Sequence, residues 1–242
     1  MTDIELLKEI IKNSESIVFF GGAGVSTESG IPDFRSAGGL YNQEEDDGVS
    51  PEEKLHISYL SHNPEGFYKY YKRNMLCTWA KPNDAHYVLA ELERQGKLTA
   101  VVTQNIDGLH QAAGSNTVYE LHGTVHKNYC MTCGKEYPLE HVINSDGVPR
   151  CSCGGIVRPD VVLYGEGLNS HVWYDAAESI STCDTLIVAG TSLTVYPAST
   201  LLDYYEGENL VIINKSPTAK DGDAALVINE PVGQVLKAAT EE

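Results

Sequence analysis

Basic residues are scarce in this chain of 242 residues. The 17 Lys and Arg stand against 34 Asp and Glu, which gives a formal net charge of -17. A surface of that sign repels phosphate backbones and anionic membrane surfaces. We therefore expect no nucleic-acid ligand and no membrane partner, whereas a basic partner is easier to accommodate.

Long apolar runs are also missing. No stretch approaches the roughly 18 apolar residues of a membrane-spanning helix. The first 13 residues lack the charged-then-apolar order of a secretory signal peptide. The sequence therefore predicts a cytoplasmic protein. Its length and its 42% apolar content suffice for one large domain, or for a domain with a smaller insert.

Four of the six cysteines lie close together in the sequence, at Cys130, Cys133, Cys151 and Cys153. They form a C-x2-C pair and a C-x-C pair, with 17 residues between the pairs. This spacing is typical of a tetrahedral zinc site made of four thiolates. Two disulfides are the alternative, which the lack of a secretory signal disfavours. Because four sulfurs complete the coordination sphere, we expect a structural zinc ion rather than a catalytic one.

Short apolar runs alternate with helical patterns along the rest of the chain. The runs typical of buried parallel strands are 16–20, 98–103, 185–190, 209–214 and 224–228. Helical patterns occupy 3–13, 83–95 and 170–181, and Thr2 with Glu5 predicts a capping box at the first of them. Right-handed crossovers would join such strands into an open parallel sheet with helices on both faces. The sequence therefore predicts an α/β, Rossmann-like fold.

Two segments interrupt the alternation. Residues 36–80 are polar and aromatic, with EEDDG at 44–48 as an expected loop, and all four clustered cysteines fall within 125–159. We predict that a helical insertion at 36–80 and a zinc-binding ribbon at 125–159 form a small domain. The Rossmann-like domain would then consist of 1–35, 81–124 and 160–242.

Glycine-rich or polar residues directly follow four of the predicted strands. The first strand leads into Gly22 and Gly24, and the polar sets after the others are TQNID (103–107), GTS (190–192) and NK (214–215). Ligands of open parallel sheets bind outside the carboxyl ends of the strands. We expect Gly22 and Gly24 to let backbone N–H groups approach a pyrophosphate. Helix capping explains one such set, but four together predict a dinucleotide site.

An ordinary dehydrogenase fits this dinucleotide site poorly. The dehydrogenase fingerprint has Gly or Ala where this chain has Thr27. It also requires an acidic residue that closes the second strand about 20 residues further on. Here that region is an expected loop.

The motifs of this chain resemble those of bacterial sirtuins, which are NAD-dependent protein-lysine deacylases. The motifs are GAGVSTESGIPDFRS, TQNIDGLH, ELHGT, the two cysteine pairs, VVLYGE, GTSL and INK, and the resemblance extends from about residue 16 to residue 233. GIPDFRS and QNID are especially specific to the family. The resemblance implies release of nicotinamide from NAD, transfer of the acyl group from lysine to ADP-ribose, and one structural zinc ion.

The resemblance also implies roles at the reacting end of NAD. His122 would be the general base, since a side chain with a pKa near 6.5 accepts a proton at neutral pH. Asn105 would bind ribose hydroxyls or an ordered water, and Gln104 would face the ribose. Asp107 would hold the nicotinamide carboxamide, with the backbone of Ile106 beside it.

Other residues would contact the rest of the cofactor. By resemblance, Phe34 covers the reacting face of the sugar and Arg35 is placed for the phosphates. The remaining cofactor residues implied by position are Gly22, Ala23, Gly24, Thr27, Asp33, Gly190, Thr191, Ser192, Asn214, Lys215 and Val232.

Two segments resemble those between which sirtuins bind an acyl-lysine peptide as an added strand, namely 161–166 and 193–196. The branch that removes succinyl and malonyl groups has a Tyr and, three positions later, an Arg. This chain has Tyr68 and Tyr71 there. A buried carboxylate would then lack its cationic partner, so we predict acetyl and neutral acyl substrates, unless Lys72 or Arg73 substitutes.

Two other functions stay open at this point. A protein mono-ADP-ribosyltransferase on the same fold would attach ADP-ribose to proteins. A non-catalytic module that senses NAD would bind NAD and release nothing. The presence of both His122 and Asn105 favours the deacylase.

Overall fold

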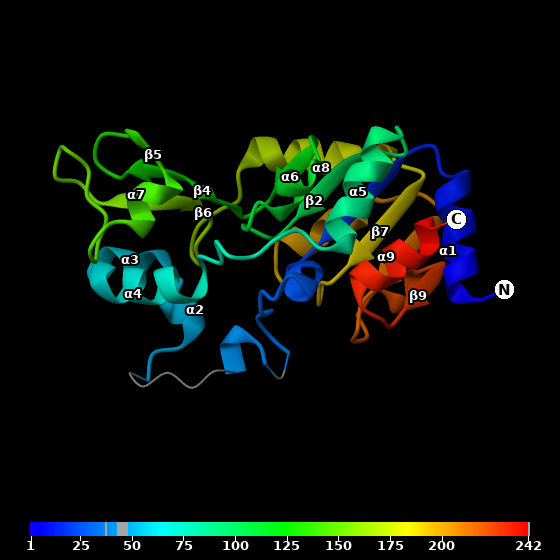
Figure 1. The fold of residues 1–242 in the computed structure, drawn as a ribbon, viewed down its shortest axis with the longest axis horizontal. Coiled ribbons are helices and arrows are strands. Elements are labelled where there is room, and N and C mark those ends of the chain that lie inside the picture. Colours follow the sequence, from blue (N-terminus) through cyan, green and yellow to red (C-terminus); the bar gives the residue numbers. More distant parts are fainter. Residues whose placement is uncertain (37, 43–47, 242) are drawn as a thin grey trace.

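The computed structural model describes residues 1–36, 38–42 and 48–241, and these form two sheets (Figure 1). The larger sheet and its helices lie at one end of the molecule, and a smaller module lies at the other. Most of the predicted 44–48 loop is outside the described residues. No helix of the described part is long and apolar enough to cross a membrane.

The larger sheet is parallel throughout, in the order β3-β2-β1-β7-β8-β9. Its strands are β1 (Ile17–Gly21), β2 (Leu98–Thr103), β3 (Val118–Glu120), β7 (Thr185–Ala189), β8 (Asn209–Ile213) and β9 (Leu226–Ile228). The chain adds strands on one side of β1 and then, from β7 onward, on the other side. This order is that of dinucleotide-binding Rossmann folds, whose ligand crevice lies where the direction changes. The predicted Rossmann-like fold class is therefore confirmed, and the crevice is expected between β1 and β7.

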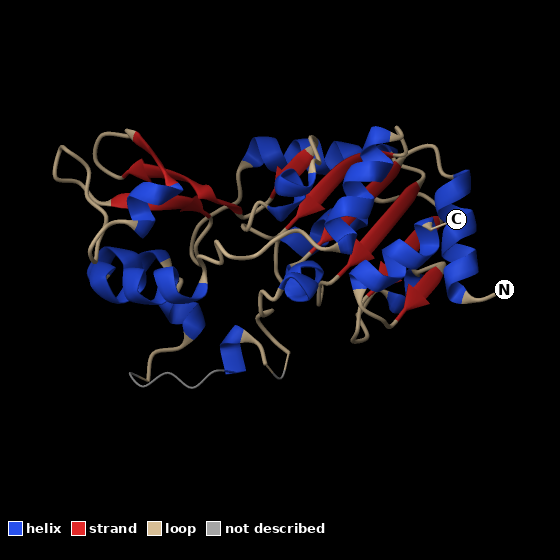
Figure 2. Cartoon of the chain, viewed as in Figure 1, coloured by secondary structure: helices blue, strands red, loops and turns tan. Residues whose placement is uncertain are grey.

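Helices cover both faces of this sheet (Figure 2). One face carries α1 (Asp3–Asn13), α5 (Asp84–Arg94) and α9 (Val232–Thr240), and the other carries α8 (Ser170–Thr182) and the 3-10 helix η3 (Ala198–Tyr204). Successive strand residues point to opposite faces, so Phe19 enters the first core and Phe20 the second. Burial on both sides explains why the strands are continuous apolar runs.

The small module combines an antiparallel sheet, in the order β5-β4-β6, with short helices. Its elements are η2 (Leu40–Asn42), α2 (Pro51–Lys54), α3 (Ile57–His62), α4 (Pro64–Asn74), β4 (Gly123–Cys130), β5 (Glu136–Pro138), α7 (Leu139–Ile143) and β6 (Val157–Val161). An aromatic core that contains Phe67, Tyr68 and Tyr71 joins the helices to this sheet. Strands β4 and β6 run across the predicted boundaries at 124 and 159, so the assignment of residues to two domains stays a prediction.

Two buried histidines lie between α5 and the short helix α6 (Leu109–Ala113). The ring centroids of His86 and His110 are 4.7 Å apart. His86 Nδ1 accepts a hydrogen bond from the Asn83 N–H at 3.1 Å. Nε2 of His86 and both ring nitrogens of His110 have no hydrogen-bond partner among the described residues. Burial is the main reason why the pKa of each histidine lies below its ordinary value.

Stability should decrease in acid because of this pair. The pKa values are lowered in the folded state, so the unfolded chain binds more protons once the pH falls below about 6.5. We expect the free energy of unfolding to fall between pH 6.5 and 5, by up to about 1.4 kcal/mol per pH unit for each histidine. Urea unfolding at several pH values measures this slope. His110→Leu should make it shallower, whereas His171→Leu, which changes an exposed histidine of α8, should leave it unchanged. Equal slopes in His110→Leu and the wild type would contradict the explanation.

Candidate functional site

The carboxyl ends of β1 and β7 meet through their backbones. The 3-10 helix η1 (Ala23–Ser29) begins just after β1 and passes against Gly190, which follows β7. A Cβ atom on Gly24 would lie 2.6 Å from the Gly190 Cα, and one on Gly22 would lie 2.8 Å from the Thr191 Cβ. Gly190 itself has a φ of 60°, a left-handed conformation that favours glycine. These glycines are therefore required by the close approach of the two loops.

The N–H groups of Gly22 and Gly24 themselves bind within the protein. The Gly22 N–H donates to the Ala189 carbonyl at 3.2 Å, and the Gly24 N–H donates to the Gly190 carbonyl at 2.8 Å. These two N–H groups are engaged within the protein, so the expected approach to a pyrophosphate falls to other N–H groups of this loop and stays a prediction. Cofactor contacts by Gly22, Gly24 and Gly190 stay predictions, but their glycine identity follows from packing.

A hydrogen-bonded network joins η1 to the polar segment after β2. Ser26 Oγ donates to Asp107 Oδ2 at 2.7 Å and accepts from Asn105 Nδ2 at 3.1 Å. Asp107 Oδ1 accepts from the Leu109 N–H at 2.9 Å, at the start of α6. Ser26 is only 1% exposed. The network fixes the side chains of Asn105 and Asp107, and Ser26 is a site residue that the sequence analysis missed.

A second contact joins the ends of β2 and β7. Gln104 Nε2 donates to Thr191 Oγ1 at 3.0 Å, and the Gln104 N–H donates to the Gly21 carbonyl at 2.9 Å. Thr191 Oγ1 also accepts from the Leu193 N–H at 3.2 Å. Gln104 and Thr191, predicted from separate motifs, are thus brought together across β1.

His122 follows β3 and is held by one ring nitrogen. Its Nδ1 lies 2.9 Å from the Gln104 carbonyl oxygen. Because a carbonyl only accepts, Nδ1 must carry the proton in this bond, which leaves Nε2 as an acceptor. Burial lowers the pKa of His122, and the bond to Gln104 opposes this shift in part. The imidazole is therefore neutral at neutral pH, with Nε2 able to take a proton.

The loop after η1 contains three more predicted residues. Asp33 Oδ1 accepts from the N–H groups of Arg35 and Ser36, at 3.0 and 2.7 Å. The carboxylate of Asp33 thus holds its own loop together. The centroids of the Phe34 and Tyr41 rings are 5.3 Å apart. The guanidinium of Arg35 lies over the same Tyr41 ring, 5.4 Å from its centroid. Phe34 packs, together with Ile106, against the core of the small module.

The remaining predicted cofactor residues lie at strand ends or on η1. Thr27 Oγ1 donates to the Gly24 carbonyl at 2.9 Å, and Asn214 Nδ2 donates to the Ser216 carbonyl at 2.7 Å. Val232 is only 3% exposed and packs in the core, so a ligand could reach it mainly through its backbone. Further contacts and exposures are as follows: Ser192 Oγ is 2.7 Å from Thr194 Oγ1, Ala23 is half-buried, and Lys215 is exposed.

The four clustered cysteines fit a tetrahedral zinc site. Their Sγ atoms all lie within 4.8 Å of one another, with separations of 3.5 to 3.6 Å for three of the pairs. A zinc ion with Zn–S bonds of about 2.3 Å would hold its sulfurs about 3.8 Å apart, whereas a disulfide needs about 2 Å. None of the four is in a disulfide, so the structure does not support the disulfide alternative. The cluster lies in the small module and would leave no coordination position open for catalysis.

Comparisons with known proteins identify relatives of this chain. Residues 22–197 match the model of the Sir2 family. An NAD-dependent protein deacetylase of Clostridium acetobutylicum is 56% identical over 236 residues, which cover 97% of this chain and 96% of the relative. A Sir2 structure with a p53 peptide and NAD+ is 39% identical, with a TM-score of 0.85, and the match covers 98% of this chain and 96% of that one.

A second Sir2 structure, with a deacetylated p53 peptide and 3'-O-acetyl ADP-ribose, is also 39% identical. Its TM-score is 0.89, and the match covers 98% of this chain and 97% of the other. The family model matches most of the chain, and the bacterial relative matches nearly all of it at more than half identity. The resemblance seen in the motifs is therefore confirmed, and this chain belongs to the Sir2 family.

Proposed function

We propose that this protein is an NAD-dependent protein-lysine deacetylase. The observation that carries the proposal is the position of His122, whose Nδ1 is 2.9 Å from the Gln104 carbonyl while Nε2 is left to accept a proton. The same short segment supplies Asn105 and Asp107, both fixed through Ser26. The base after β3 and the polar side chains after β2 are thus held together at one edge of the sheet. The relatives that are named as NAD-dependent deacetylases support the proposal.

Bound at this edge of the sheet, NAD would supply ADP-ribose as the acyl acceptor when its nicotinamide–ribose bond breaks. An amide oxygen is a poor nucleophile, so the protein must contribute positioning and charge stabilisation. Asp107 and the backbone of Ile106 would hold the carboxamide of nicotinamide. Asn105 would bind the ribose hydroxyls or an ordered water, and Phe34 would exclude water from the reacting face.

His122 would act on the acceptor as a general base. Its Nε2 would take the proton of a ribose hydroxyl, and the resulting imidazolium would keep its Nδ1–H bond to the Gln104 carbonyl. Burial keeps the imidazole unprotonated before this transfer. A base with a pKa near or below the working pH is mostly in its active form.

Acetyl-lysine proteins or peptides would bind as an added strand between 161–166 and 193–196. The first segment is tied to the proposed base, because the Val162 N–H donates to the His122 carbonyl at 2.9 Å. Related structures with acetylated or deacetylated peptides support this substrate class. Absence of nucleic-acid and membrane partners and a cytoplasmic location stay predictions from the sequence.

Carboxylated acyl groups should be poor substrates. Tyr71 is fully buried and stacks on Phe67, with ring centroids 5.4 Å apart. The Tyr68 hydroxyl donates to the Val157 carbonyl. Lys72, a possible substitute cation, donates from Nζ to the Ser145 carbonyl at 2.6 Å. Arg73, the other possible substitute, is exposed. A buried succinyl carboxylate would therefore lack the guanidinium that it needs.

Turnover of an acetylated peptide tests the proposed function. Incubation with NAD and the peptide should release nicotinamide and deacetylated peptide in equal amounts. His122→Ala should lower kcat/KM by about 100-fold or more, the usual loss of a general base, whereas His171→Ala should leave it unchanged. A succinylated peptide should react at least about tenfold more slowly, since an unpaired buried charge costs more than 1.4 kcal/mol.

Other outcomes of that assay would point to the alternative functions. ADP-ribose attached to protein without deacetylation would indicate a mono-ADP-ribosyltransferase. Binding of NAD without release of nicotinamide would indicate a sensing module. Equal activity of His122→Ala and the wild type would contradict the assigned base.

Metal analysis tests the zinc site separately. The purified protein should contain about one zinc ion per chain, measured by mass spectrometry. Cys130→Ser should lose the metal and lower the melting temperature, because the ion joins the two ends of the ribbon. Cys77→Ser, which changes a cysteine outside the cluster, should keep the metal. A folded Cys130→Ser protein with full zinc content would contradict the assignment.

A further inference from the structure

We propose that Tyr41 and Tyr164 are positioning residues that connect the cofactor loop to the peptide segment. The cofactor loop is residues 31–36 and 38–42, which include Phe34 and Arg35, and the peptide segment is residues 161–166. Through the bond between the two tyrosine hydroxyls, a bound peptide would favour the loop conformation that accepts NAD. This inference rests on the proposed function, because it takes the two segments to bind NAD and peptide.

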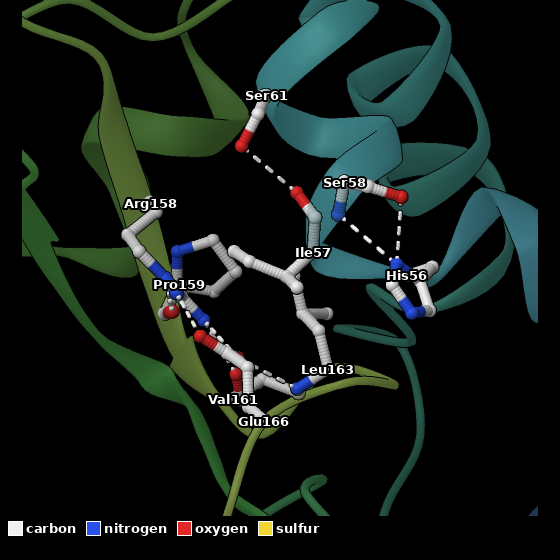
Figure 3. Close-up of polar contacts among 9 residues, drawn as sticks. All are labelled: His56, Ile57, Ser58, Ser61, Arg158, Pro159, Val161, Leu163 and Glu166. Atoms are coloured by element: carbon white, nitrogen blue, oxygen red, sulfur yellow. Dashed lines mark hydrogen bonds and ion pairs between the residues drawn. The ribbon is translucent and has the colours of Figure 1, made fainter.

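The peptide segment is rigidly held from the side of β6 (Figure 3). Arg158 is 6% exposed and donates from Nη1 and Nη2 to the two carboxylate oxygens of Glu166, at 2.6 and 2.8 Å. It also donates from Nε to the Pro159 carbonyl at 3.1 Å and from Nη2 to the Val161 carbonyl at 2.9 Å. Glu166 Oε2 accepts from the Leu163 N–H at 2.9 Å. This bidentate pair joins Arg158 to Glu166 and fixes the backbone between these two residues.

The helical side of the small module fixes the same segment at Tyr164. The Tyr164 N–H donates to the Leu55 carbonyl, and the Tyr164 carbonyl accepts from the Ile57 N–H, both at 3.0 Å. The next residue, Gly165, has a φ of 88°, and a Cβ atom there would lie 2.7 Å from His56 Nε2. Both the N–H and the carbonyl of Tyr164 are thus hydrogen-bonded, which fixes the backbone that carries its side chain.

Tyr41 is held within the cofactor loop by backbone and ring contacts. Its N–H donates to the Phe34 carbonyl at 2.9 Å, and its ring packs against the Phe34 ring. The Arg35 guanidinium lies 5.4 Å from the centre of the Tyr41 ring, within the range of a cation–π contact. A shift of Tyr41 would therefore displace the two residues that we assign to the ribose and the phosphates.

The two tyrosine hydroxyls are hydrogen-bonded to each other. Burial, and next the bond to Tyr164, raise the pKa of Tyr41 well above its ordinary value, so this hydroxyl keeps its proton. Either of the two hydroxyls can donate in the bond. Tyr164 is 40% exposed, so its ring extends from the fixed segment toward the surface. The bond joins residues 123 positions apart in the chain and links the peptide segment to the cofactor loop.

The consequence is a reciprocal coupling between the two ligands. If peptide binding further orders residues 161–166, the bond from Tyr164 to Tyr41 should also restrain the cofactor loop. Linkage then requires NAD to tighten peptide binding by the same factor. Because the coupling depends on one hydrogen bond between neutral groups, each ligand should lower the dissociation constant of the other by roughly 2- to 10-fold through this bond.

Calorimetry of NAD binding in a His122→Ala background tests the pair, because deacetylation should be slowed there by about 100-fold or more. The dissociation constant of NAD is measured with and without a saturating acetylated peptide. In this background the peptide should tighten NAD binding. Tyr41→Phe or Tyr164→Phe, which keep the rings and remove one hydroxyl, should reduce the tightening by roughly 2- to 10-fold. The double variant should resemble either single variant, because both hydroxyls serve one bond.

Matched controls separate coupling from a general loss of structure. Tyr174→Phe changes a tyrosine of α8 that is 70% exposed and should keep the full tightening. The melting temperature should stay close to that of the background protein in all Phe variants, and NAD affinity without peptide should stay unchanged in Tyr174→Phe. Equal tightening in Tyr41→Phe and its background, or losses that add in the double variant, would overturn the proposal. The binding measurement needs no turnover, so failure of the deacetylation test would not by itself decide it.

Discussion

The backbone contact between the first loop and Gly190 is the constraint on which the rest of the site depends. Strands β1 and β7 lie at the centre of the sheet, where the order of strands changes direction. A side chain at Gly24 would push η1 away from Gly190. The loop would then carry Ser26 away from Asp107, its partner at 2.7 Å. Because the glycines have no side chain, the two strand ends can lie close enough for polar side chains to contact each other.

The polar contacts form a continuous path from this edge to the small module. Thr191 binds Gln104, the Gln104 carbonyl binds His122, and the His122 carbonyl binds Val162 at the end of β6. Each step is a hydrogen bond of 2.9 to 3.0 Å. The proposed base therefore lies at the junction between the cofactor edge and the peptide segment. Its buried position keeps it neutral, which a base requires.

Local patterns were sufficient to predict much of the fold. The buried run at 98–103 is β2, and the pattern at 3–13 is α1, with both capping-box bonds of Thr2 and Glu5 formed. Strand β3 was missed because it has only three residues, all half-buried, at the edge of the sheet. Helix α9 was missed as well, and its residues Val232–Thr240 include a glycine that weakens the helical pattern.

Contacts between residues far apart in the chain could not be predicted from the sequence. Nothing in a serine at position 26 indicates that it bridges Asn105 and Asp107, which lie 79 and 81 positions away. The engaged N–H groups of Gly22 and Gly24 likewise depend on a partner loop far along the chain. The cysteine cluster was predictable because the metal imposes its own spacing on the sequence. The family motifs supplied the rest, as expectations for individual residues.

The pH dependence of kcat/KM for deacetylation tests the central claim most directly, because it reports the protonation of the free enzyme's base. We predict an acid-side decline whose midpoint lies below the ordinary histidine value of about 6.5, since burial lowers the pKa of His122. The residual activity of His122→Ala should lack this decline. A midpoint at or above about 6.5, or the same decline in His122→Ala, would contradict the account.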